Sequence, residues 1–127
     1  MSEIKTFRDL IAWQKGIELA KHVYRTTQTF PETERFGLVS QMRRAAVSIP
    51  SNIAEGYARA SLQDYIRFLK VARGSLAELQ TQVFLAHELG FLKTPAVPVE
   101  LATETDRVLQ GLIRSLEAKG DRGSPPK

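Results

Sequence analysis

The feature that most constrains the fold is the stretch SLQDYIRFLKVARGSLAELQTQVFLAHELG, residues 61–90. Its apolar residues recur at steps of three and four, at Leu62, Tyr65, Leu69, Ala72, Leu76, Leu79, Val83 and Ala86. This spacing predicts one long helix with a continuous apolar face. Ser61 with Asp64 resembles a capping box at its start, and Gly90 is a stop signal at its end. A face this long must pack against other helices.

Three further helices are predicted. The first runs from about Asp9 to Thr29, with Asp9 or Thr6 as its cap, and Phe30-Pro31 ends it. The second starts near Thr33 and ends near Gly56. The fourth starts between Thr94 and Pro98 and ends at about Lys119. Their expected apolar stripes are Leu10, Trp13, Ile17, Ala20 and Tyr24; then Phe36, Val39, Met42, Ala46, Ile49 and Ile53; then Leu101, Val108, Leu112 and Leu116, with Leu109 and Ile113 beside them.

No segment alternates in the manner of a strand, so the expected class is all-α. Four long helices with short connections predict an antiparallel up-down four-helix bundle. We expect a single domain over residues 1–119 and a flexible tail over 120–127. Large apolar residues flank the main stripe of the third helix, so another subunit is a candidate to cover them.

The segment RRAAVSIPSNIAEGYAR, residues 43–59, places a proline inside the second helix. Pro50 cannot donate to the carbonyl of Ala46, which predicts a kink there. Ser48 and Asn52 can serve the freed carbonyl or recruit water. Gln41, Ser48, Asn52 and Glu55 share one face of the second helix. A similar polar line on the third helix, which includes Glu78, could meet that face. We therefore predict that these five residues form a structural polar seam between the two helices.

Catalysis finds little support in the sequence. The chain has no cysteine, which removes thiol chemistry, disulfides and thiolate metal sites and fits a reducing cytosol. His22 and His87 have no metal-ligand spacing, and Ser48 has no histidine close in sequence. We therefore expect no enzyme, no cofactor and no metal. No apolar run reaches a membrane span and the N-terminus lacks a signal peptide, so a cytoplasmic protein is expected.

Positive charge gathers in the first half of the chain. The net charge is +4, and residues 1–60 hold nine Lys and Arg against six Asp and Glu. Such a surplus favours anionic partners. The candidate nucleic-acid contacts are cations on the second and third helices: Arg43, Arg44, Arg59, Arg67, Lys70 and Arg73. Arg43 and Arg44 must point about 100° apart, so only one of them need face outward. The alternative is a solvated surface with ordinary ion pairs such as Glu55–Arg59.

The stretches FRDLIAWQKGIELAKHVYRTTQTFPETERFGLVSQMRRAAVSIPSNIAEGYAR and YIRFLKVARGSLAELQTQVFLAHELGFL carry a resemblance. They resemble a bacterial four-helix bundle family encoded within intervening sequences of 23S rRNA genes. That family is similar to the accessory variability protein of diversity-generating retroelements. The resemblance covers about residues 7–92, and RAAVSIPSNIAEG and GSLAEL are its most specific parts. Gln80 stands where an acidic residue is expected.

The resemblance implies a subunit without catalytic activity that assembles as a ring, a homopentamer. For the retroelement relative it implies nucleic-acid binding and association with a reverse transcriptase. The leading hypothesis is therefore an oligomeric scaffold or accessory factor that binds RNA or DNA through phosphate contacts. The alternatives are an adaptor for an acidic protein partner, such as a reverse transcriptase or other RNA-processing enzyme, and an enzyme using the Ser48–Asn52–Glu55 region.

Overall fold

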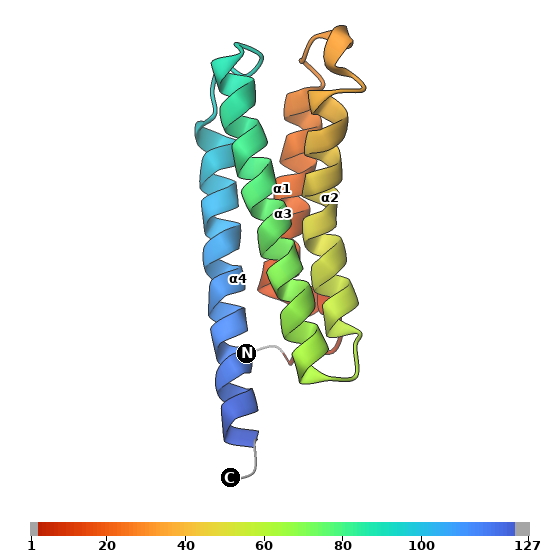
Figure 1. The fold of residues 1–127 in the computed structure, drawn as a ribbon, viewed down its shortest axis with the longest axis vertical. Helices are drawn as coiled ribbons and strands as arrows, with labels where there is room; N and C mark the ends of the chain where they lie inside the picture. Colours follow the sequence, from red (N-terminus) through yellow and green to blue (C-terminus); the bar gives the residue numbers. More distant parts are fainter. Residues whose placement is uncertain (1–2, 124–127) are drawn as a thin grey trace.

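The computed structural model describes residues 3–123, and within them it is all-helical. Four α-helices make up the fold: α1 (Ile11–Thr27), α2 (Leu38–Tyr57), α3 (Leu62–Glu88) and α4 (Ala96–Gly123). Two short 3₁₀ helices, η1 (Phe7–Asp9) and η2 (Glu32–Glu34), precede α1 and α2. Each α-helix packs on its neighbours in the chain, and α4 closes the bundle against α1 (Figure 1). The prediction of an all-α protein with four helices is confirmed.

The direction of the chain can be followed by colour in Figure 1, where the chain runs upward along α1 and α3 and downward along α2 and α4. Side-chain contacts follow the same order. Arg43, early in α2, binds Thr27 at the end of α1, and Gly56, late in α2, lies against Phe68 early in α3. Because α1 packs on α2 and α4, and α3 packs on the same two helices, the α1–α2 side of the bundle is opposite the α3–α4 side.

The first helix differs from its prediction. Thr6 and Asp9 form a capping box on η1, and the chain is extended at Leu10 before α1 begins at Ile11. The buried stripe of α1 also has a different phase from the one expected, and it consists of small and aliphatic residues: Ala12, Gly16, Leu19, Ala20, Val23 and Thr27. The prediction that Tyr24 belongs to the core stripe is wrong, since 42% of its surface is exposed.

The second helix begins later than predicted. Gly37, with φ −103° and ψ −111°, interrupts the helical conformation between η2 and α2. The second helix therefore starts at Leu38 and not at Thr33. The prediction that Phe36 lies on the apolar stripe is therefore wrong: this residue precedes the helix and is 87% exposed. Pro50 lies inside α2, as predicted. Asn52 donates to the carbonyl of Ser48 at 2.8 Å, however, and not to that of Ala46.

The third helix matches its prediction closely. The Ser61 hydroxyl accepts a hydrogen bond from the Asp64 amide at 3.0 Å, and Gly90, with φ 82°, follows the C-terminal cap. Only a residue tolerant of the left-handed region fits that stop. The fourth helix continues past Lys119 to Gly123, and residues 124–127 of the predicted tail lie outside the described residues.

The core runs along the middle of the bundle, with all four helices contributing. Its most deeply buried side chains are Leu19, Val23, Met42, Ile49, Ile53, Leu69, Leu76, Leu79, Thr105 and Leu109. On α4, Leu116 is buried as predicted, but Leu109 and Ile113 are buried where Val108 and Leu112 are only half-buried, so the predicted stripe is displaced by one residue in that part of the helix. None of the helices within residues 3–123 combines the length and apolar character needed to cross a membrane.

Candidate nucleic-acid interface

Four of the six predicted cations are engaged in ion pairs. Arg59 pairs with Glu55 at 3.1 Å, Arg67 with Asp64 at 3.6 Å, Lys70 with Glu117 at 3.3 Å and Arg73 with Asp106 at 2.7 Å. Exposed pairs of this kind contribute about 0.2–1 kcal/mol each. A phosphate could therefore displace the carboxylate, but the loss of the ion pair would offset part of the binding free energy.

Two of these arginines also stack on one ring. The guanidinium carbons of Arg59 and Arg67 lie 4.8 and 4.6 Å from the centre of the Phe68 ring, which is buried between α2 and α3. Cation–π contacts at such distances help to fix the guanidinium planes. These two arginines therefore serve the α2–α3 packing as well as the surface charge.

Arg43 and Arg44 point in different directions, as adjacent residues on a helix must. Arg43 turns toward α1, where its Nε donates to the Thr27 hydroxyl at 2.9 Å and its Nη2 to the Tyr24 carbonyl at 3.3 Å. Its guanidinium lies 4.6 Å from the centre of the Tyr24 ring. Arg44 is exposed, and within the described residues it has neither an ion pair nor a hydrogen bond. It is the predicted cation most available to an anion.

These residues line an open groove on the α1–α2 side, with a volume of about 480 Å³. We call it the α1–α2 groove and define it by its lining: Tyr24, Arg35, Phe36, Val39, Ser40, Arg43, Arg44 and Val47. Three arginines and two aromatic rings contribute to that lining, and no carboxylate does. Arg35 lies 3.5 Å from Glu32, an exposed pair, and its guanidinium is 5.4 Å from the centre of the Phe36 ring. The groove therefore combines positive charge with exposed aromatic surface.

Tyr24 and Phe36 were not predicted as site residues because the apolar spacing assigned both rings to core stripes. Arg35 was not among the candidate cations. The signal that could have found Phe36 is the glycine after it. A break at Gly37 removes Phe36 from the helical phase, and a large apolar residue in a connection is then free to face solvent. The aromatic residues that we expected to pack, Trp13 and Tyr65, do pack against the core. Burial raises the pKa of Tyr65 to about 12.

The predicted polar seam is only partly assembled. The hydroxyls of Ser48 and Ser75 lie 2.8 Å apart and link α2 to α3, and the Asn52 amide donates to the Ser48 hydroxyl at 2.9 Å. Gln41, Glu55 and Glu78 are exposed and lie outside this cluster. Close by in sequence, Gln82 is buried, and its Oε1 has no hydrogen-bond partner in the described structure.

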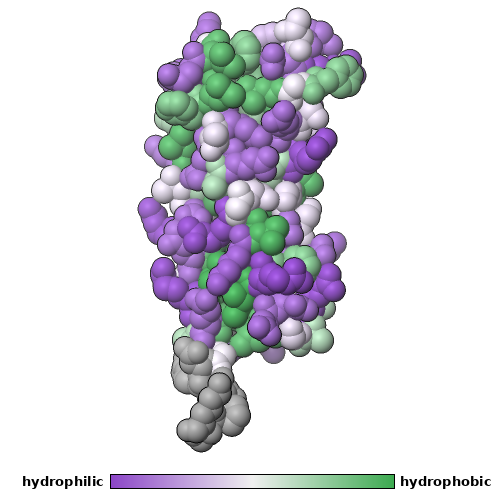
Figure 2. Space-filling view, in the orientation of Figure 1, coloured by the Kyte–Doolittle hydropathy of each residue, from purple (hydrophilic) through white to green (hydrophobic). Residues whose placement is uncertain are grey.

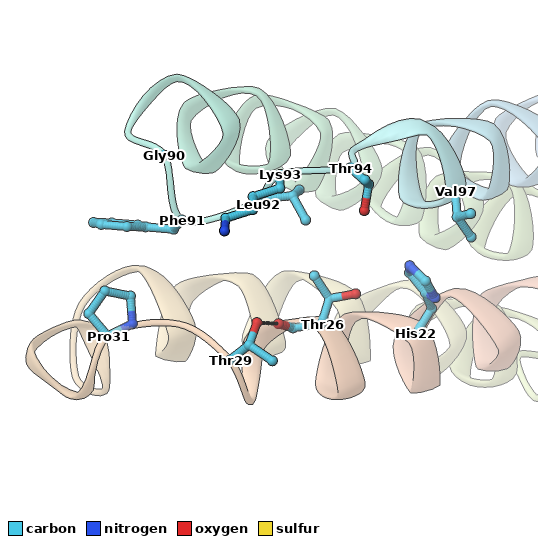
Figure 3. Close-up of a pocket in the computed structure, with 10 residues that line it drawn as sticks. All are labelled: His22, Thr26, Thr29, Pro31, Gly90, Phe91, Leu92, Lys93, Thr94 and Val97. Atoms are coloured by element: carbon cyan, nitrogen blue, oxygen red, sulfur yellow. Dashed lines mark hydrogen bonds between the residues drawn. The ribbon is translucent and has the colours of Figure 1, made fainter.

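A second concave region lies at the end of the bundle where α1 ends and the α3–α4 connection passes over it. Figure 3 shows His22 and Thr26 of α1 facing Thr94 and Val97 across this cleft, whose volume is about 580 Å³. Burial lowers the pKa of His22, and the charge of Arg25 lowers it further, so the ring is neutral at pH 7. The only hydrogen bond drawn among these residues joins the Thr29 hydroxyl to the Thr26 carbonyl at 3.0 Å. The described side chains of this cleft contain no paired nucleophile and base.

The fold and this surface define a class: a small all-helical protein of four α-helices that carries a basic, aromatic groove on one side. Comparison with protein families then places the chain. It belongs to the 23S rRNA-intervening sequence protein family, whose model matches residues 8–114. A comparison with curated proteins finds no significant match.

Proposed function

We propose that this protein is a non-enzymatic scaffold or accessory factor that binds RNA or DNA through phosphate contacts and acts as a ring-shaped oligomer. The observation that carries the proposal is the α1–α2 groove, which presents three arginines without a carboxylate in its lining. Arg44 supplies a guanidinium that no described acid neutralises. Phosphate contacts of this kind give affinity without reading the base sequence.

Assembly supports the same proposal through charge. One chain carries a net charge of +4. A ring of five copies, the number that the family resemblance implies, would carry about +20 and repeat each groove at a fixed spacing. Several weak phosphate contacts then act together because each raises the effective concentration of the next.

Exposed apolar surface supports assembly independently of charge. Figure 2 shows apolar residues gathered over the end of α3 and the start of α4. Two exposed residues of this region, Phe84 of α3 and Val99 of α4, line one apolar hollow together with Val83 and Ala102. A monomer in water rarely leaves such a group together, and a second subunit would cover it. This region lies on the α3–α4 side, away from the α1–α2 groove.

Several finer features belong to the proposal. We take the bundle to be an antiparallel up-down bundle whose α2 bends at Pro50, and the order of side-chain contacts between successive helices supports the former. The resemblance supports a relation to the accessory variability protein of diversity-generating retroelements, with a reverse transcriptase as a possible protein partner. The family resemblance supports a bacterial setting, and a cytoplasmic one fits a chain without cysteine. The neighbours of the gene, an rRNA operon or a reverse transcriptase, are the observation that distinguishes these contexts.

Filter binding at low and moderate salt tests the proposal. We expect the wild-type protein to retain RNA and DNA at low salt and to lose affinity by roughly 0.9 log units per log unit of salt for each duplex phosphate contact. Arg44→Gln should weaken binding to all sequences alike. The matched control is Arg107→Gln on α4, an equal change of charge at another exposed position. Absence of retention at low salt would disprove phosphate-driven binding.

The alternative function is an adaptor for an acidic protein, and one observation favours it. Phe36, Val39 and Val47 give the α1–α2 groove an apolar share that could accept side chains of a protein partner. Under this alternative, the protein would bind a protein encoded by a neighbouring gene and would not bind nucleic acid at low salt. Size-exclusion chromatography of the two proteins mixed would show a Phe36-dependent complex.

A further inference from the structure

The exposure of the Phe36 side chain to water is energetically unfavourable. It is 87% exposed, it precedes α2, and no core residue packs over it. A phenylalanine side chain gains about 1.5–3 kcal/mol when it is fully buried, so a residue here with no packing role gives up that stabilisation. Its ring has a cation–π contact with Arg35, whose guanidinium carbon lies 5.4 Å from the ring centre. An exposed aromatic ring beside a cation forms a platform on which a flat aromatic group can stack.

The second ring of the groove is held in place. Arg43 stacks on Tyr24 at 4.6 Å while its Nε and Nη2 are bound to Thr27 and to the Tyr24 carbonyl. The two hydrogen bonds fix the Arg43 guanidinium, and its stacking then restrains the Tyr24 ring, so a partner that binds the open part of the ring loses little entropy. Arg43 is thus a positioning residue, and Arg44, one step along α2, is the free cation beside it.

We infer that the α1–α2 groove binds a single-stranded nucleic acid, with bases stacked on Phe36 and Tyr24 and phosphates contacting Arg44 and Arg35. The inference rests on the proposed function and goes further by naming the strand form and the groove. Its observation is the pairing of two exposed rings with three arginines in one concave lining. In a duplex the base faces are already covered by their neighbours, whereas an unpaired strand offers a face for every ring.

The charge of the groove selects this occupant over a neutral apolar segment. No carboxylate lines the groove, and the polar groups of its side chains are three guanidinium groups and the hydroxyls of Ser40 and Tyr24, so a polyanion meets no negative charge there. Apolar contacts from Val39 and Val47 then border the sugar and base surface. RNA and DNA single strands share this chemistry, and the 2′-hydroxyl is the group that would separate them.

Fluorescence anisotropy with the full chain tests the inference. The probes are a labelled single-stranded RNA of about fifteen nucleotides, the DNA of the same sequence, the RNA duplex, and an abasic phosphodiester of equal length and charge. We expect the single strands to bind more tightly than the duplex. We expect the abasic probe to lose about five- to 150-fold in affinity, because stacking on one aromatic residue contributes about 1–3 kcal/mol.

Substitutions separate stacking from charge. Phe36→Leu should reduce single-strand affinity toward that of the abasic probe, while Phe36→Trp should retain it, since tryptophan also offers a flat face. The exposed position makes both variants compatible with folding. Val71→Ala on α3, an exposed apolar position outside both the groove and the proposed subunit contact, is the control and should leave binding unchanged. Arg44→Gln should weaken all probes, the abasic one included, and reduce the salt slope.

Each result supports or overturns a definite statement. If the duplex and abasic probes bind as tightly as the single strands and Phe36→Leu has no effect, the stacking inference is wrong while the proposed function stands. If no probe binds at low salt, the proposed function fails and the inference fails with it. If an acidic, aromatic peptide binds in a Phe36-dependent way and the single strands do not, the groove is a protein-docking site and the inference is overturned.

Discussion

Gly56 is the residue at which α2 presses against α3. A Cβ at this position would lie 2.7 Å from the Cβ of Phe68 and 3.2 Å from the Tyr65 carbonyl oxygen. Neither atom can move without displacing α3. We expect Gly56→Ala to destabilise the fold by about 1–3 kcal/mol, since overpacking outweighs the gain in helix propensity, which is about 1 kcal/mol. Urea denaturation would measure the change.

Gly74 provides the control for that prediction. It also lies inside a helix, but no atom beyond its immediate surroundings would come within 4 Å of an added Cβ. Gly74→Ala should therefore stabilise the protein by up to about 1 kcal/mol through helix propensity alone. Equal effects of the two substitutions would show that α2 and α3 are not in close contact at Gly56.

Asp106 offers a test by pH at the same scale. Burial tends to raise the pKa of this carboxyl, but hydrogen bonds from Arg73 at 2.7 Å and Gln110 at 2.6 Å outweigh it and lower the pKa. A lowered pKa in the folded state means that the contribution to stability is present above the unfolded pKa, about 3.9, and disappears as the pH falls through the folded value.

Asp106→Asn should therefore lower the free energy of unfolding at pH 7 by about 0.2–1 kcal/mol and have a smaller effect below about pH 3. Thermal unfolding across this range would show the difference from wild type shrinking with acid. The control is Glu100→Gln at an exposed position of the same helix, which should change little at either pH. A deficit of Asp106→Asn that is constant with pH would contradict the ion-pair explanation.

At the scale of elements, prediction from sequence was best where one pattern dominated. The Leu62–Ala86 spacing and the Ser61 and Gly90 signals fixed α3 because steps of three and four repeat without interruption. On α1 and α4 two adjacent apolar rows compete, such as Val108 with Leu109, and only the neighbouring helices decide which row is buried. The start of α2 was missed because η2 resembles the first turn of a longer helix, and the interruption at Gly37 was not recognised.

The link between α2 and α3 yields a prediction of its own. Ser48 and Ser75 share a half-buried hydrogen bond of 2.8 Å, and Asn52 supports Ser48 from the next turn. Removal of one hydroxyl leaves the other short of a partner, whereas removal of both leaves no orphan across the helix pair. We expect Ser75→Ala to cost about 1 kcal/mol, and a double-mutant cycle with Ser48→Ala to show a coupling of about 0.5–1.5 kcal/mol. Additive effects in urea denaturation would contradict a direct bond.

At the scale of the whole molecule, the fold class followed from sequence because four amphipathic patterns leave few other ways to bury their faces. The candidate site did not follow in the same way. Of the predicted cations, Arg59, Arg67, Lys70 and Arg73 have acid partners, two of them on α4, and a tertiary contact of that kind cannot be derived from local spacing. The α1–α2 groove depends on Phe36 and Tyr24 leaving the core, which is likewise a result of tertiary packing.

The last prediction concerns assembly. The exposed apolar surface on the α3–α4 side includes Phe84, which is 66% exposed and lines one hollow with Val99. A ring buries one such patch against a different surface on the next subunit, so closure leaves no free end. We expect the wild-type protein to give a mass in light scattering of about five times 14.2 kDa at micromolar concentration.

Phe84→Glu should shift that mass toward the monomer, because a buried carboxylate without a partner opposes association by several kcal/mol. The change should leave the helical circular dichroism intact, since the side chain lies outside the core. Phe36→Glu on the α1–α2 side is the matched control and should keep the oligomer, although it should abolish nucleic-acid binding. A wild-type mass equal to one chain would exclude the ring, and dissociation by Phe36→Glu instead would place the subunit contact at the α1–α2 groove.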